Sequence, residues 1–206
     1  MNDEKRAELL LNHYNDTFQQ ILYHWKARNR LFLYALIVLT LLAFASYSPG
    51  LVSGLIHAYL KETLKYTTPI DLAVVESAGW FVLLSLVIQY YQRSIHVDRQ
   101  YKYISEVEKH ICEAMGGDYI TREGKGYYSK TGVATAQQQE RRPVYLRSVG
   151  LLYQYAFPLL LIVFAAWGVV RQASCLNTAT GVLNLLAALM LIAYNAFYLL
   201  WVVRRH

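Results

Sequence analysis

Long apolar stretches separated by polar segments dominate this 206-residue chain and limit the folds that are open to it. A transmembrane helix needs about 20 mostly apolar residues, because the hydrocarbon core of a bilayer is about 30 Å thick. Such a pattern is typical of spanning helices rather than of a globular core. The sequence therefore predicts an all-α membrane protein with four transmembrane helices, at Leu31–Tyr47, Leu72–Tyr91, Val149–Val170 and Val182–Val203.

The second stretch does not end where its apolar residues end. Gln92–Met115 contains no Pro and no Gly, and its apolar residues recur every three or four positions, as one face of a helix requires. We expect one continuous helix, Leu72–Met115, that ends at Gly116-Gly117 and is about 65 Å long. The stripe consists of Val97, Tyr101, Ile104, Val107, Ile111 and Met115.

Residues 3–30 read as an amphipathic helical arm that continues into the first span without a breaker. Its apolar residues alternate steps of four and three, which is a heptad pattern. The arm could pack on the polar extension 92–115, or lie flat on the membrane with its basic residues at the headgroups. The acidic start at Asp3 and Glu4 favours packing. The seam consists of Ala7, Leu11, Tyr14, Phe18, Ile21 and Trp25.

The distribution of Lys and Arg predicts the orientation of the chain in the membrane. Most of the 20 Lys and Arg residues precede the first span, lie between the second and third spans, or follow the fourth, whereas the other loops hold only Lys61, Lys65 and Arg171. By the positive-inside rule, both termini and the central segment are cytosolic. No cleavable signal peptide is expected. The predicted parts are a cytosolic arm (1–30), two spans (31–91) with an outer loop (48–71), a cytosolic helix with a basic insert (92–148), two further spans (149–203) and a cytosolic end (204–206).

Several polar or breaking residues lie in or beside the spans. The outer loop contains a short helix, which is either interfacial or a re-entrant pore helix. Glu76, Ser85 and Gln89 form a candidate pore-lining track, with a snorkelling carboxylate as the alternative for Glu76. Pro158 predicts a kink that is either a hinge or only shape. Asn184 and Asn195 are amides of the kind that hold helices together in lipid.

The insert after Gly117 predicts a small hairpin at 118–130 and carries many cations among aromatic rings. Cations for phosphates and aromatic rings for bases are what a nucleotide or single-stranded oligonucleotide site needs. Cytosolic loops beside spans are also basic for orientation alone. The candidate ligand-binding residues are Arg122, Lys125, Tyr127, Tyr128, Lys130, Arg141, Arg142, Tyr145 and Arg147.

No catalytic motif is present in the sequence: there is no metalloprotease, nucleophile-elbow, Walker or dinucleotide pattern. His110 follows Glu106 by four residues, which is typical of a solvated pair on one helix. The two cysteines have no His or Cys at ligand spacing, so no metal site is expected. We predict neither an enzyme nor a cofactor.

One stretch resembles a known group of proteins. It reads Tyr101-Lys102-Tyr103-Ile104 … Glu108, followed by Arg122-Glu123-Gly124 … Tyr127-Tyr128. This pattern, with the spans and the basic insert, resembles the membrane effectors of bacterial anti-phage systems, namely the transmembrane effectors of CBASS-type defence and the Hailong channel effectors. The resemblance implies a channel in the bacterial inner membrane that a nucleotide or oligonucleotide controls, that depolarises the membrane, and that works with a nucleotide-synthesising enzyme.

The sequence thus favours a homo-oligomeric gated channel, with a tetramer preferred, because the seams on both polar extensions are natural assembly surfaces. The alternative is a non-conducting membrane scaffold whose arms dock a soluble partner and whose insert contacts anionic lipid. A small transporter would predict internal repeats, and the two halves of this chain do not match.

Overall fold

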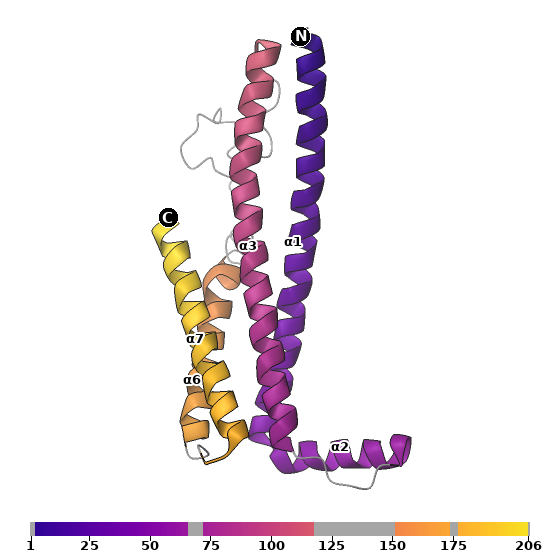
Figure 1. Cartoon of the computed structure of the whole chain (residues 1–206), viewed down its shortest axis with the longest axis vertical. Helices are drawn as coiled ribbons and strands as arrows, with labels where there is room; N and C mark the ends of the chain where they lie inside the picture. Colours follow the sequence, from indigo (N-terminus) through magenta and orange to yellow (C-terminus); the bar gives the residue numbers. More distant parts are fainter. Residues whose placement is uncertain (1–2, 66–71, 118–150, 174–176, 206) are drawn as a thin grey trace. The chain divides into compact units, whose positions relative to one another are not determined.

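The structure, a computed structural model, describes residues 3–65, 72–117, 151–173 and 177–205, and these are almost entirely helical (Figure 1). The helices follow one another as α1 (Asp3–Tyr47), α2 (Pro49–Leu64), α3 (Leu72–Met115), a π-helical turn η1 (Leu152–Ala156), α6 (Phe157–Gln172) and α7 (Ala179–Arg205).

Within the described ranges, four helices are long and apolar enough to cross a membrane: α1, α3, η1 with α6, and α7. They coincide with the four predicted spans, which confirms the all-helical, multi-pass class for the part of the chain described. The hairpin predicted at 118–130 lies outside the described residues, and the orientation of the chain in the membrane stays a prediction.

Helix α3 runs unbroken through its apolar and polar halves, with the predicted bounds Leu72–Met115. It ends because Gly116 takes a positive φ of 71°, a conformation that costs glycine no steric penalty. The amide of Gly117 then donates to the carbonyl of Cys112 at 3.1 Å, which satisfies one of the last carbonyls of the helix in a Schellman-type cap. Helix α1 is likewise one helix from Asp3 to Tyr47, so the expected continuous arm is confirmed.

The chain divides into two compact units. The arm unit comprises the first part of α1, to Arg30, and the second part of α3, from Gln89. The span unit comprises the rest of α1 and α3 together with α2, η1, α6 and α7. We describe each unit by itself.

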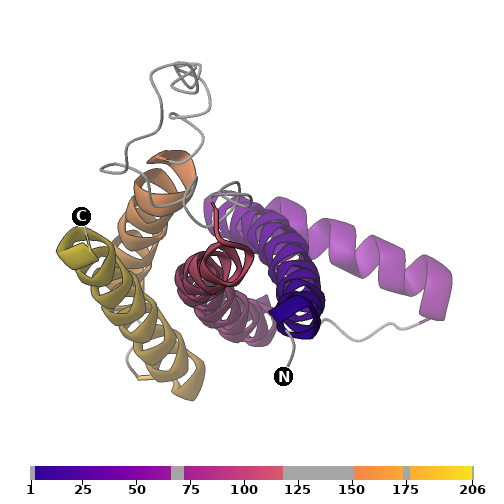
Figure 2. The same cartoon turned by 90° about the horizontal axis from the view of Figure 1, so that it is seen from above.

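In the arm unit, the two helices lie side by side and bury the predicted seams on each other (Figures 1 and 2). Ile21, Val97, Tyr101 and Ile104 form its buried cluster, and Tyr14 and Phe18 pack against it. The packed arrangement is therefore confirmed over the helix lying flat on a membrane. Two seam residues differ from the expectation, since Trp25 is 45% exposed and Met115 is 43% exposed. At the level of Trp25, His24 makes the contact with α3 instead.

In the span unit, aromatic rings and glycines join the helices. The indole of Trp80 on α3 stacks on Phe164 of α6, with ring centroids 5.2 Å apart. A Cβ added to Gly168 would come within 2.8 Å of this indole, and one added to Gly79 would come within 2.7 Å of Leu42. Only glycine therefore fits at these two positions without movement of a neighbour. Helix α6 also runs alongside α7 (Figure 2).

At the proline of the third span, the helix changes its winding rather than losing its hydrogen bonds. The turn before Pro158 is π-helical, and the amide of Phe157 donates to the carbonyl of Leu152, five residues earlier. Pro158 then occupies the first turn of α6, where a missing N–H costs little. Where the sequence predicted a kink, at Pro158, the helix thus contains a π-helical turn. Single π-helical turns within α-helices are frequent at functional sites.

The helix predicted in the outer loop is α2, Pro49–Leu64. Its apolar side chains Leu51, Leu55 and Tyr59 are each about two-thirds exposed, so they pack against little of the chain itself. Both interpretations of this helix, interfacial and re-entrant, stay open, because exposed apolar side chains suit lipid in either position.

Candidate functional site

All nine predicted ligand-binding residues lie outside the described residues. They are Arg122, Lys125, Tyr127, Tyr128, Lys130, Arg141, Arg142, Tyr145 and Arg147. The ligand-binding site therefore stays a prediction from the sequence. The described part of the chain contains several other polar arrangements, which lie in the span unit and in the arm unit.

The first arrangement is an ion pair in the span unit. Arg171, in the last turn of α6, contacts the carboxylate of Glu76 in the second turn of α3. The side chain of Glu76 is only 15% exposed and that of Arg171 is 31% exposed. A charge in a span is tolerated when it is paired with an opposite charge. Glu76 is thus paired with a cation of the neighbouring span, and both interpretations of it, a pore-lining and a snorkelling carboxylate, stay predictions.

Sequence reasoning counted Arg171 only as a loop charge and missed this pair. The available signal was the presence of opposite charges at the same outer ends of two spans. It was not decisive, because the sequence does not show which spans are neighbours.

The second arrangement concerns Ser85 and Gln89, which are exposed on α3. Nine residues separate Ser85 from Glu76, which is two and a half turns at about 3.6 residues per turn. The two side chains therefore project from opposite sides of the helix, and the expected single line through Glu76, Ser85 and Gln89 does not form. Ser85 and Gln89 share a face, so a polar track made by these two remains a prediction.

The two buried asparagines of α7 behave differently from each other. Asn195 is fully buried, and its Nδ2 donates to the carbonyl of Leu191 in its own helix at 2.6 Å. Asn184 is 2% exposed, and its Oδ1 accepts no hydrogen bond within the described ranges. The indole N–H of Trp80 is likewise buried without an acceptor there. Unpaired buried polar groups cost free energy, so both are sites where a water molecule or a partner would stabilise the protein.

The third arrangement is a basic cluster in the arm unit, formed by His24 of α1 with Arg93 and His96 of α3. Nη1 of Arg93 lies 2.6 Å from Nδ1 of His24, and the rings of His24 and His96 meet edge to face with centroids 4.4 Å apart. A guanidinium can only donate, so Nδ1 of His24 accepts this hydrogen bond. Burial lowers the pKa of His24 below its ordinary value of 6.5, and the neighbouring His96 and Arg93 lower it further.

Further polar contacts connect the two helices of the arm unit along its length. Nε2 of His13 lies 2.7 Å from the hydroxyl of Tyr103, and the hydroxyl of Tyr14 donates to Glu108 at 3.3 Å. Glu108 is completely buried. Together with the buried Tyr101 and Ile104, these contacts show that the stretch from Tyr101 to Glu108 is the surface of α3 that packs on α1. A packing role thus accounts for the spacing of this stretch.

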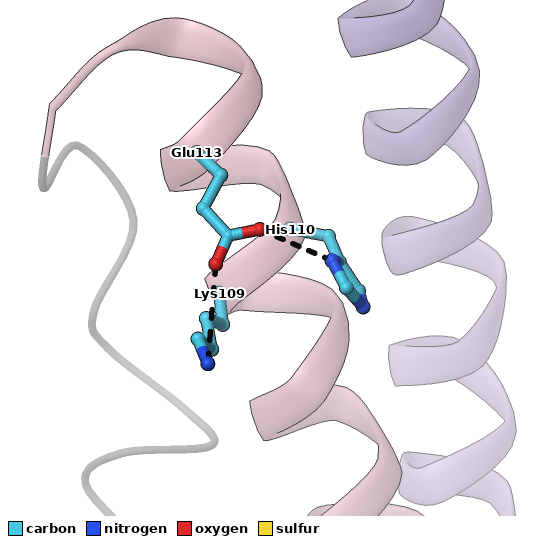
Figure 3. Close-up of polar contacts among 3 residues, drawn as sticks. All are labelled: Lys109, His110 and Glu113. Atoms are coloured by element: carbon cyan, nitrogen blue, oxygen red, sulfur yellow. Dashed lines mark ion pairs between the residues drawn. The ribbon is translucent and has the colours of Figure 1, made fainter.

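Near the end of α3, the ion pairs lie on the surface (Figure 3). Glu113 lies 3.9 Å from Nζ of Lys109 and 3.4 Å from Nδ1 of His110, and all three side chains are more than half exposed. The pair predicted between Glu106 and His110 is wrong in its partner, because His110 pairs with Glu113 instead. Exposed pairs of this spacing contribute only about 0.3–0.5 kcal/mol, and we assign them no function.

Comparison with known proteins adds no relative: no family model, no curated protein and no solved structure matches the chain. Within the described ranges, no three His, Cys, Asp or Glu side chains are grouped so as to hold a metal ion.

Proposed function

We propose that this chain is the subunit of an oligomeric membrane channel, with a tetramer favoured, whose conductance is controlled through its polar helical arms. One observation carries the proposal: α1 and α3 each run as one unbroken helix from a membrane-spanning half into a polar half. A change in packing at the polar end of such a helix must displace or rotate the residues that follow it, because a helix without a break does not absorb the change locally.

The buried charged residues of the arm unit support a packing of the two arms that a ligand can change. Its seam includes the buried charged residues Asp98 and Glu108 beside apolar Ile104 and Ile111. Buried polar groups make packing sensitive to small changes, because a lost partner leaves a costly unpaired group. A ligand that prefers one packing of the arms would shift the population toward it.

Exposure in the spanning half of α3 supports assembly. Ser85 and the amide of Gln89 are exposed on an otherwise apolar stretch. Polar side chains that face lipid are costly, and they usually face protein or a water-filled path. In an oligomer, this face of α3 would meet another copy or line the conducting path.

The ligand of this proposal is a cytosolic nucleotide or oligonucleotide bound by the basic and aromatic insert that contains Arg141 and Arg142. The resemblance to anti-phage membrane effectors supports this ligand, and it also supports a bacterial inner-membrane location and depolarisation as the outcome. A nucleotide-synthesising enzyme would be the source of the ligand.

The first test is the membrane potential of bacteria that express the chain, read with a voltage-sensitive dye. Depolarisation that Gln89→Leu reduces, and that the control Thr40→Val leaves intact, would support the channel. Thr40 is the matched control because it is also exposed in a spanning helix, while its hydroxyl bonds the carbonyl of Leu36 in its own helix.

The ligand is tested with the double variant Arg141→Glu/Arg142→Glu. It should change gating while membrane insertion is kept, whereas reversing two exposed charges on α3, Arg99→Glu/Lys102→Glu, should not. An unchanged ligand response in the first variant would remove the site. The chain is also reconstituted into bilayers, with and without the nucleotide that is extracted together with the protein. If no current flows in either case, the result favours the alternative, a scaffold that docks a soluble partner.

A further inference from the structure

Among the described residues, no carboxylate is a counter-ion of the basic cluster of the arm unit. Within the described residues, no ion pair joins a carboxylate to His24, Arg93 or His96. The described partners of these side chains are one another and the ring of Tyr23, which lies 5.3 Å from that of His24. Arg93 carries a permanent positive charge that no carboxylate of the described residues pairs with, so a bound anion would stabilise it.

The geometry prepares Arg93 for such an anion. One of its five N–H donors is used on Nδ1 of His24, which fixes the position of the planar guanidinium. The remaining donors are available to an acceptor, and a guanidinium matches the oxygens of a phosphate group in pairs. His96 is exposed, so a ligand can reach this side of the cluster.

The position of the cluster along the helices indicates where the anion would come from. Arg93 follows the end of the apolar stretch at Tyr91 by two residues, about 3 Å along the helix, and His24 precedes the stretch at Leu31 by about 10 Å. The headgroup layer on each side of a bilayer occupies about 5–8 Å. Next to His24, the exposed ring of Trp25 lies 6.0 Å from the guanidinium of Arg28, and this combination is typical of a membrane interface.

We propose that His24, Arg93 and His96 form a binding site for a phosphate group, supplied by the headgroup of an anionic phospholipid or by a soluble phosphate. Arg93 is the main donor, His24 holds it in place, and the exposed His96 packs edge to face on the ring of His24. The site is distinct from the basic insert and does not depend on whether the chain conducts ions.

The test is native mass spectrometry of the full chain in detergent, with equal amounts of phosphatidylglycerol and phosphatidylcholine, and with inorganic phosphate as a competitor. We expect selective retention of phosphatidylglycerol, a loss of about tenfold in its affinity in Arg93→Gln, and little change in Arg30→Gln. Arg30→Gln is the matched control because it removes the same charge, from an exposed position that also lies close to the end of an apolar stretch.

Each outcome decides between the alternatives. If the chain retains phosphatidylglycerol selectively and inorganic phosphate does not displace it, the site binds the lipid headgroup. If inorganic phosphate displaces phosphatidylglycerol, or binds when phosphatidylcholine is the only lipid present, the site binds a soluble phosphate. An equal loss in Arg93→Gln and Arg30→Gln would show only general attraction and would overturn the site. If Arg93→Gln does not fold, the wild-type chain still decides, because equal retention of the two lipids together with no binding of phosphate contradicts the proposal.

Discussion

The arm unit and the span unit contain parts of the same two helices, α1 and α3, yet each unit joins them by different side chains. In the arm unit, large side chains such as Ile21, Tyr101 and Ile104 fill the contact, with histidine, tyrosine and glutamate contacts beside them. In the span unit, glycine permits close approach, as at Gly79 against Leu42.

The difference follows from the solvent that each unit suits. Polar helices in water gain stability by removing large apolar side chains from water. Spanning helices gain nothing from that transfer, since lipid is as apolar as leucine, so close packing and polar contacts must hold them together. The comparison can be tested by making matched substitutions in the two units.

The largest expected difference concerns large buried aliphatic residues. Ile104→Ala in the arm unit should cost about 2–5 kcal/mol, because it loses both transfer free energy and packing. Leu191→Ala in α7 should cost less, because only packing is lost in lipid; both residues are completely buried. Hydrogen exchange of the amides in each unit, measured by mass spectrometry, reports the two losses separately. Equal losses would contradict the solvent argument, and Met115→Ala, at an exposed position, serves as the neutral control.

Ion pairs should show the opposite ranking. Arg171→Ala leaves Glu76 unpaired and largely buried, and breaking a buried pair costs about 3–5 kcal/mol. We expect the lower end of that range, because Arg171 is itself 31% exposed. Lys109→Ala breaks the exposed pair with Glu113 in the arm unit and should cost less than about 0.5 kcal/mol. Thermal unfolding in detergent compares the variants, and a similar shift for both would show that the pair of Glu76 is solvated.

The two glycine contacts of the span unit should differ from each other. Gly168→Ala places a methyl group against the rigid indole of Trp80, and we expect a cost of about 1–3 kcal/mol from overpacking. Gly79→Ala meets the flexible end of Leu42, which can move, so its cost should be smaller. The thermal midpoint of each variant in detergent measures the difference. A larger loss in Gly79→Ala would mean that Leu42 is held more firmly than its flexible end suggests.

The smallest expected effect is a pH dependence confined to the arm unit. The pKa of His24 is lowered in the folded chain, so the unfolded chain binds more protons between the lowered pKa and 6.5. His24 therefore contributes stability that is fully present above pH 6.5 and is lost as the pH falls through this window. His24→Gln should flatten this part of the profile of arm exchange against pH, and the span unit should be unaffected. A profile that stays the same in His24→Gln would exclude His24 as its origin.

Much of the fold could be predicted from local pattern. The bounds of α3, its glycine ending and the continuous α1 follow from apolar periodicity and from the absence of Pro and Gly, which are properties of neighbouring residues. The seam between the arms also follows, because two stripes of matching length on consecutive antiparallel helices have each other as nearest partners.

The candidate site could be predicted less well. A polar track through Glu76 and Ser85 was expected from their shared polarity, and the helical angle between them excludes it. The ion pair of Glu76 with Arg171 depends on which spans are neighbours, and neither periodicity nor charge counts contain that information.

By itself, then, the sequence determined the helices, their lengths and the apolar face of each arm, because these depend on short-range spacing and on the preference of apolar residues for leaving water. Only the tertiary structure decided that Trp80 lies against Gly168, that Arg171 neutralises Glu76, and that Arg93 meets two histidines with no carboxylate partner in the part of the chain described. These contacts join residues from different helices, and their free energy depends on distance and burial, which arise only when the helices pack.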